Sequence, residues 1–97
     1  MTCLVVSNAR DNVATALVSL EPGQRIAAGE RTIQVLEPVA RGHKIALRHI
    51  ATGEAVVKYG SPIGLASADI VEGAHVHTHN VASTRGRGDL AAEWTKR

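Results

Sequence analysis

"RGHKIALRHIATGEAVVKYGSP", residues 41–62, sets two short β-favouring segments between three turn sequences. The segments are KIALRHI (44–50) and EAVVKYG (54–60), and the turns RGH, ATGE and YGSP supply glycine or proline. Valine- and isoleucine-rich segments bounded in this way are typical of strands. This stretch therefore predicts an antiparallel sheet rather than a helical domain.

The same alternation of turn and strand continues on both sides. Further turns are EPG (21–23), AAGE (27–30), EP (37–38) and VEGA (71–74), and further candidate strands are CLVV (3–6), RTIQVLE (31–37) and HVHTHNV (75–81). Turns that recur every ~8–12 residues are typical of small all-β domains. We predict one mainly β domain over residues 1–97, with its core in 11–83, and we find no repeat of ~20–50 residues.

Two segments have helical alternatives. DNVATALVSLEPG (11–23) fits a helix capped by Asp11 or Asn12, and it fits a strand equally well. The dense turns around it favour the strand. DLAAEWTK (89–96) predicts a short helix within a C-terminal tail of residues 84–97.

Composition excludes several classes of protein. The chain has no Phe, one Trp and one Tyr, so aliphatic side chains must fill its core, which suits closely paired sheets better than a deep cavity. The net charge is only +2 and stacking aromatics are missing, which argues against nucleic-acid binding. One cysteine cannot form an internal disulfide. The first residues, MTCLVVSNARDN (1–12), hold too short an apolar run for a signal peptide, and no run approaches the ~20 apolar residues that span a bilayer, so we expect a cytoplasmic chain without a membrane partner.

Three of the five histidines, His75, His77 and His79, alternate in HVHTHN (75–80). On a strand all three would share one face. Their neighbouring Cα atoms would lie ~6.6 Å apart, so an adjacent pair can lean toward one ion but a straight row of three cannot. The pattern predicts a two-ligand metal unit whose other ligands come from another chain. A solvated strand face with locally hydrogen-bonded histidines is the alternative, and the spacing leaves both open.

Two other segments carry candidate binding residues. His43 and Lys44 follow Gly42 and could hold a carboxylate or a phosphate, or form a solvated turn. In VVKYG, Lys58 could bind an anion or be a surface charge. Tyr59 beside it is expected in the core with its hydroxyl at the rim.

Read together, DNVATAL (11–17), GHKIAL (42–47), GEAVVKYGSPIG (53–64) and GAHVHTHN (73–80) resemble a known domain. They are similar to the small N-terminal domain of the altronate dehydratase and galactarate dehydratase family. SLEPGQRI (19–26) also resembles the wider SAF superfamily. The resemblance runs from about Asp11 to Ser83 and implies a β-clip, or SAF-like, fold of short strands.

The resemblance also implies a function. In longer family members this domain precedes a much larger catalytic region, so this chain looks like the small subunit of a two-subunit hydro-lyase that is inactive alone. Such an enzyme converts altronate or galactarate to a 2-keto-3-deoxy acid and uses a divalent metal, Fe²⁺ before Mn²⁺ or another ion, shared with the large subunit. Two alternatives stay open: a sulfolactate sulfo-lyase-like small subunit, and a free-standing module that binds an acidic sugar or metal, in isolation a possible homo-oligomer.

Dehydration of a hydroxy acid needs stabilisation of the negative charge that develops beside the carboxylate, and an acid for the departing hydroxyl. The resemblance then implies three groups of residues. The metal ligands are expected among His75, His77 and His79, with His77 and His79 as the catalytic acid or base. The residues expected to bind substrate are His43, Lys44, Lys58 and Asn80.

Overall fold

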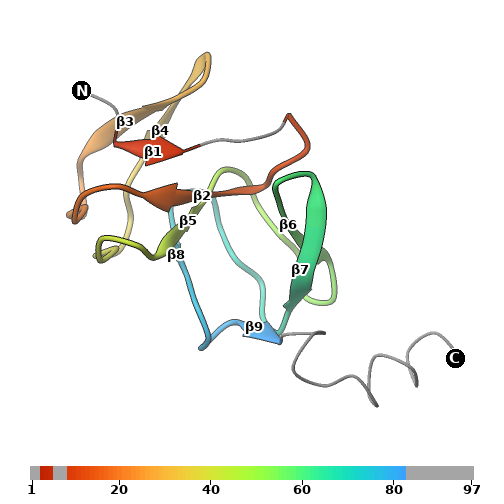
Figure 1. Cartoon of the computed structure of the whole chain (residues 1–97). Coiled ribbons are helices and arrows are strands. Elements are labelled where there is room, and N and C mark those ends of the chain that lie inside the picture. The colour runs from red at the N-terminus through yellow and green to blue at the C-terminus, as the bar shows by residue number, and fades with distance from the viewer. Residues whose placement is uncertain (1–2, 6–8, 83–97) are drawn as a thin grey trace, which may run out of the picture.

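The computed structural model describes residues 3–5 and 9–82, and all its regular elements are strands (Figure 1). They are β1 Leu4–Val5, β2 Val13–Ala16, β3 Arg25–Ala28, β4 Arg31–Gln34, β5 Lys44–Ala46, β6 Ala55–Lys58, β7 Ser61–Ala66, β8 His75–Val76 and β9 Val81–Ala82. The predicted mainly β domain is confirmed, and the segment from Asp11 forms strand β2 rather than a helix. The helix expected at 89–96 lies outside the described residues. The described part of the chain has no helical segment that could span a bilayer.

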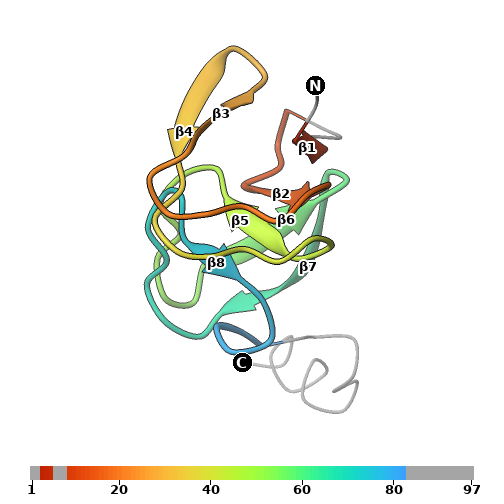
Figure 2. The same cartoon turned by 90° about the vertical axis from the view of Figure 1, so that its left-hand side faces the viewer.

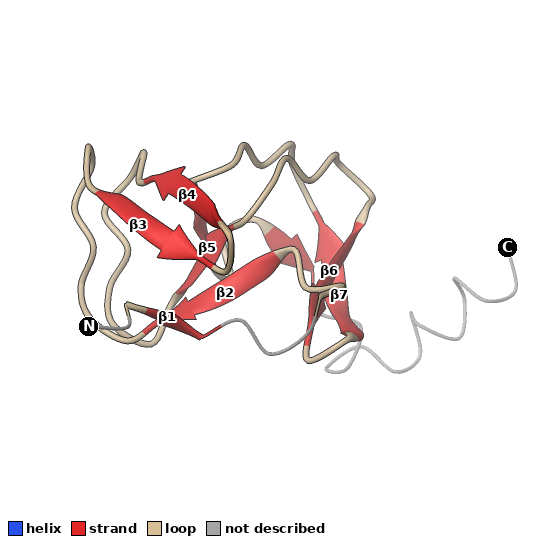
Figure 3. Cartoon of the chain, turned by 90° about the horizontal axis from the view of Figure 1, so that it is seen from above, coloured by secondary structure: helices blue, strands red, loops and turns tan. Residues whose placement is uncertain are grey.

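The strands form three antiparallel sheets. The central sheet has the order β1-β2-β5-β8, a two-stranded sheet is formed by β3 and β4, and a third sheet has the order β6-β7-β9. Figures 1 and 3 show the β3–β4 hairpin and the β6–β7 hairpin on different sides of the central sheet. Strands β3 and β7 are not among the predicted strands, and each begins or ends within a predicted turn sequence, AAGE (27–30) for β3 and YGSP (59–62) for β7.

The central sheet separates two hydrophobic clusters because its side chains alternate between faces. Ala14 and Ile45 point toward the first cluster, which includes Ile26 and Ile33 from the β3–β4 hairpin. Val13 and Ala46, directly before and after them in sequence, point toward a second cluster. Its other members come largely from the β6–β7 side: Ile50, Val56, Ala66, Ile70, Ala74 and Val76.

Asn12 fastens the central sheet to the third sheet. Its side chain is fully buried, its Nδ2 donates to the carbonyl of Ala55 at 2.9 Å, and its Oδ1 accepts the N–H of Val57 at 2.7 Å. Its own backbone N–H donates to the carbonyl of Val57 at 3.2 Å. A residue with helix-capping potential thus bridges two sheets, and both polar atoms of its buried side-chain amide have a hydrogen-bond partner.

The fold contains an internal two-fold repeat that the sequence did not reveal. Leu20 and Val39 form a reciprocal backbone bridge at the base of the β3–β4 hairpin, and Ile50 and Ile70 form the same bridge at the base of β6–β7. Strand β5 follows the first hairpin as β8 follows the second, and these two strands pair with each other. Figure 2 shows them side by side. Equivalent positions share only turn glycines and buried aliphatic residues, so the repeat is structural and nearly invisible in sequence.

Candidate functional site

The site is built where the two halves of the repeat meet. Strands β5 and β8 pair in antiparallel register, with Lys44 opposite Val76 and Ile45 opposite His75. Continued by one residue, this register places His43 opposite His77. Residues opposite one another or diagonal on an antiparallel pair lie within side-chain contact. The pairing therefore brings His43 beside His75 and His77, which follow it by more than 30 residues in the sequence.

The three imidazoles form a stack. The ring centroids of His43 and His77 are 3.8 Å apart with an interplanar angle of 7°, and those of His43 and His75 are 5.0 Å apart at 10°. Nδ1 of His43 lies 2.8 Å from Nε2 of His75. One ligand nitrogen from each of the three rings lies within 4.8 Å of the others. We call His43, His75 and His77 the histidine cluster.

The expectation of a straight strand through all the histidines of HVHTHN was wrong. Strand β8 ends at Val76, and residues 77–80 form a bend and turn. Asn80 closes this turn: its Oδ1 accepts the N–H of His77 at 3.0 Å and its Nδ2 donates to the carbonyl of His75 at 2.9 Å. Its side chain, expected to contact substrate, is engaged in shaping the segment that carries the cluster.

His79 lies beside the histidine cluster but outside it. Its ring centroid is 5.0 Å from that of His75 with a tilt of 32°, and its side chain is exposed. The geometry groups His43 with His75 and His77, whereas the sequence pattern grouped His79 with them, and the ligand role of each histidine stays a prediction. The signal that could have found His43 is the Gly-x pattern shared by GHK (42–44) and GAH (73–75), which marks equivalent positions of the repeat.

Lys44 borders the same site. Together with His77 it lines a pocket of about 170 Å³, whose other walls are Ile63, Val76, Thr78 and Val81. On β5, Lys44 shares its face with Ala46, so its side chain points toward the β6–β7 hairpin. An ammonium group beside a cluster of imidazoles favours the approach of an anion.

Lys58 and Tyr59 reverse the expected exposure. Lys58 is 4% exposed and Tyr59 is 66% exposed, although a surface lysine and a core tyrosine were the plain expectations. Nζ of Lys58 lies 4.1 Å from the centre of the Tyr59 ring. In the described part of the chain, this Nζ has no hydrogen-bond partner.

The environment lowers the pKa of two of the clustered imidazoles and so favours their neutral form. Partial burial lowers the pKa of His75, and the nearby charges of His79, His43 and His77 add to that effect against a smaller opposing contribution from Glu37. Partial burial also lowers the pKa of His77, with His43 and Lys44 contributing. Neutral imidazoles are the form that binds metal ions.

These shifts predict acid sensitivity of the metal-free chain. A folded-state pKa below the unfolded value of ~6.5 means that the unfolded chain takes up protons first as the pH falls. The stability that His75 contributes is therefore complete above that value and is lost progressively as the pH falls toward the lowered folded pKa. We expect the melting temperature in EDTA to drop between pH 7.5 and 5.5, and to drop less in His75→Gln.

The matched control is His49→Gln, because His49 is an exposed histidine outside the cluster. A drop in melting temperature that is as large in His75→Gln as in the parent chain would contradict this account.

The histidine cluster has the donor set of a transition-metal site, and the ligand nitrogens of its three rings lie within 4.8 Å of one another. Two imidazole nitrogens bound to one ion at ~2.0–2.1 Å lie ~3 Å apart, close to the 2.8 Å between His43 and His75. Without an ion the same contact is an N–H···N hydrogen bond, which requires complementary tautomers on the two rings. Imidazole donors suit iron, zinc and similar ions better than magnesium or calcium. The residues present therefore fit a divalent transition metal.

A small all-β module with a repeat-generated cluster of three imidazoles is the class of protein that fold and site define. The chain matches the family model for the altronate/galactarate dehydratase SAF domain over residues 2–84. It belongs to that family, as the sequence resemblance predicted.

Individual relatives support this assignment. The chain is 52% identical to altronate dehydratase of Escherichia coli (strain K12) over 73 residues, which are 75% of this chain and 15% of that protein. It is 44% identical to altronate dehydratase of Bacillus subtilis (strain 168) over 80 residues, 82% of this chain and 16% of that protein. It is also 39% identical to (2R)-sulfolactate sulfo-lyase subunit alpha of Chromohalobacter salexigens over 88 residues, 84% of this chain and 94% of that subunit. The chain thus spans about a sixth of the two altronate dehydratases.

Proposed function

We propose that this chain is the small, metal-holding subunit of a carbon–oxygen lyase that dehydrates a sugar acid. The observation that carries the proposal is the histidine cluster, which lies where β8 forms an edge of the central sheet. At an edge, a second polypeptide can approach the cluster and complete it. An ion held by three imidazoles would keep coordination positions that the substrate or a side chain of the partner can fill.

Family membership supports both the reaction class and the need for a partner. The two altronate dehydratases contain a large region that this chain does not match. The sulfo-lyase relative, by contrast, is named as a subunit and is nearly coextensive with the matched segment. The proposed large chain would supply most of the substrate contacts.

Different residues of this chain have different roles in the proposed reaction. When bound, a divalent metal, Fe²⁺ or else Mn²⁺, supplies Lewis-acid stabilisation of the negative charge that develops beside the carboxylate. His43, His75 and His77 hold that ion with one ring nitrogen each. Lys44 attracts the substrate carboxylate toward His77. His79, exposed beside His75, delivers a proton to the departing hydroxyl oxygen.

A sulfo-lyase is the second candidate function. The match over 94% of the sulfo-lyase subunit alpha specifically favours it, because a separate chain of this extent is the arrangement in that enzyme. The demands on the small subunit are the same in both reactions, since each removes a leaving group from the carbon next to a carboxylate-bearing centre. Sulfite then takes the place of water as the product.

The test is reconstitution with the large chain. The tagged protein is purified from its own cells, any lyase-like large chain that accompanies it is identified, and the assembly is offered altronate, galactarate and (2R)-sulfolactate. We expect no turnover by the small chain alone and formation of a 2-keto-3-deoxy acid by the assembly, whereas sulfite release would favour the second candidate. An assembly that stays active when His43, His75 and His77 are all alanine would refute the proposed role of the cluster.

A further inference from the structure

Lys58 is a buried cation with an unusual environment. It is the last residue of β6, and strand alternation gives it the same inward direction as Val56, which belongs to the second hydrophobic cluster. Only 4% of the residue is exposed, and within the described residues Nζ has neither a hydrogen-bond partner nor an ion pair. Buried ammonium groups are normally paired because desolvation without compensation is costly.

The compensation present here is the ring of Tyr59. Its centre lies 4.1 Å from Nζ, a distance at which an aromatic face attracts a cation. A ring provides no hydrogen-bond acceptor of oxygen type, so the three N–H donors of Lys58 are left without the partners that they favour.

Tyr59 occupies its position at a conformational cost. It has φ of 56° and the next residue, Gly60, has φ of 73°, so both central residues of the β6–β7 turn lie in the left-handed region. Turns of this kind strongly prefer asparagine or glycine at the first position. Tyr59 is also 66% exposed and therefore adds little to the core. A strained, exposed aromatic residue over a buried cation indicates a functional constraint rather than a packing one.

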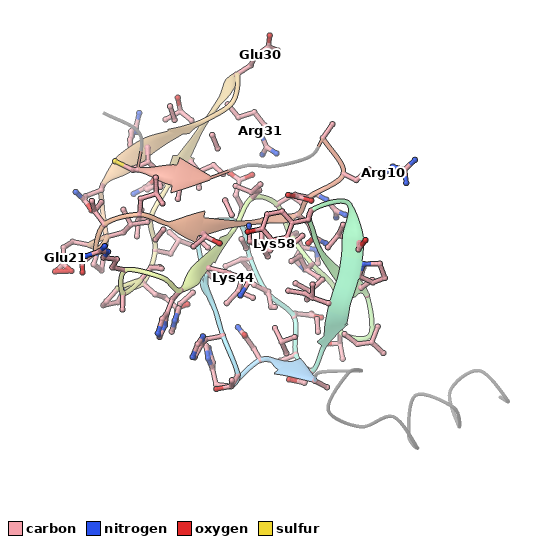
Figure 4. The ribbon with its side chains drawn as sticks, viewed as in Figure 1. Arg10, Glu21, Glu30, Arg31, Lys44 and Lys58 are labelled. Carbon is pink, nitrogen blue, oxygen red and sulfur yellow. The ribbon has the colours of Figure 1, made fainter. Side chains whose placement is uncertain are left out.

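The other charged groups near the turn are Asp11 and Lys44. The carboxylate of Asp11 approaches the turn but accepts the backbone N–H of Gly60 at 2.8 Å. Lys44, on β5, shares a face with Ala46, which packs in the same cluster as Val56. Strand alternation therefore directs both lysines toward the layer between the central sheet and the β6–β7 hairpin, and Figure 4 labels both of them.

We propose that Lys58 anchors a carboxylate-binding site and that the bound carboxylate replaces the Tyr59 ring over the ammonium group. A carboxylate supplies both the negative charge and the oxygen acceptors that Nζ requires. This inference rests on the proposed function for the identity of the ligand, the carboxylate of a sugar acid. An aspartate or glutamate of the large chain offers the same chemistry, and the experiment separates the two sources.

The experiment uses the full chain labelled with ¹³C on its lysines and tyrosine, in EDTA, and titrates it with galactarate. The control ligand is galactitol, which has the same carbon skeleton without charge. We expect saturable shifts of the Lys58 Cε and Tyr59 ring signals with galactarate and none with galactitol. Lys58→Met should weaken galactarate binding at least tenfold, whereas Arg25→Gln, which removes one exposed positive charge from β3, should leave it unchanged.

Two melting-temperature measurements test the inference even if galactarate binds too weakly to be measured. Lys58→Met removes an unpaired buried charge while keeping an unbranched side chain, so the melting temperature of the free chain should rise. Tyr59→Asn suits the turn better, so it should raise the melting temperature and also tighten galactarate binding, because the competing ring is gone. A lowered melting temperature in Lys58→Met would show that the ammonium is already satisfied, and would overturn the inference.

The source of the carboxylate follows from two arms of the titration. A shift of Lys58 with galactarate in the isolated chain assigns the site to substrate. A shift that appears only when the co-purified large chain is added, without any acid, assigns it to a partner side chain. No shift in either arm overturns the site. Because the first arm uses EDTA and the isolated chain, its result does not depend on metal binding or on turnover, so it can fail or succeed separately from the proposed function.

Discussion

Replacing Gly73 with alanine should destabilise the chain by about 3–5 kcal/mol, a large part of the stability of a domain this size. Gly73 has φ of +88°, and a Cβ at this position would lie 2.0 Å from the carbonyl oxygen of Gln34. That oxygen belongs to the backbone at the end of β4, so it cannot rotate away as a side chain could. The backbone must separate there, which endangers the hydrogen bond from the N–H of Leu36 to the carbonyl of Gly73.

Gly42→Ala is the matched control. Gly42 occupies the equivalent turn of the repeat with φ of +87°, but a Cβ there would meet nothing within 4 Å. Only the backbone penalty applies, which is about 1–2 kcal/mol for an alanine in the left-handed region. Urea denaturation of the two variants measures the difference directly. Equal losses would mean that the close approach of Gly73 to β4 does not matter for the fold.

The second large effect concerns metal affinity. His43→Ala and His77→Ala should each weaken the binding of Zn²⁺ or Co²⁺ by about 100-fold or more, since even residues that merely orient a metal ligand contribute 10–100-fold. Neither change should unfold the chain, because both side chains are only half-buried. Isothermal titration calorimetry gives the affinity, and the visible spectrum of bound Co²⁺ reports the ligand set.

Two other histidines serve as controls for this measurement. His49→Ala removes an exposed histidine outside the cluster and should leave the affinity unchanged. His79→Ala discriminates between the two ligand sets. It should change the metal affinity little if His43, His75 and His77 hold the ion, and should weaken it strongly if His75, His77 and His79 do. If His43→Ala binds the ion as tightly as the parent chain, His43 is not a ligand, and the ligand set His43, His75 and His77 is disproved.

Much of the fold could be predicted because turn glycines and aliphatic segments are local signals. Strands β5 and β6 lie inside the segments chosen from the quoted stretch. Strand β7 was missed because it contains Pro62 and Gly64, which ordinarily argue against a strand. The structure accommodates Pro62 at an irregularity, since the β6–β7 register shifts between Val56 and Val57.

By itself the sequence determined the mainly β class, the family, and the presence of histidines and lysines able to bind a metal and an acid. Only the tertiary structure decided which of them act together. It placed His43 in the cluster, left His79 beside it, and buried Lys58 beneath Tyr59. The physical reason is that antiparallel pairing joins residues by register, and the register of β5 against β8 is set by the packing of two hairpins on opposite faces of the central sheet. The spacing of residues along the sequence therefore cannot predict that packing.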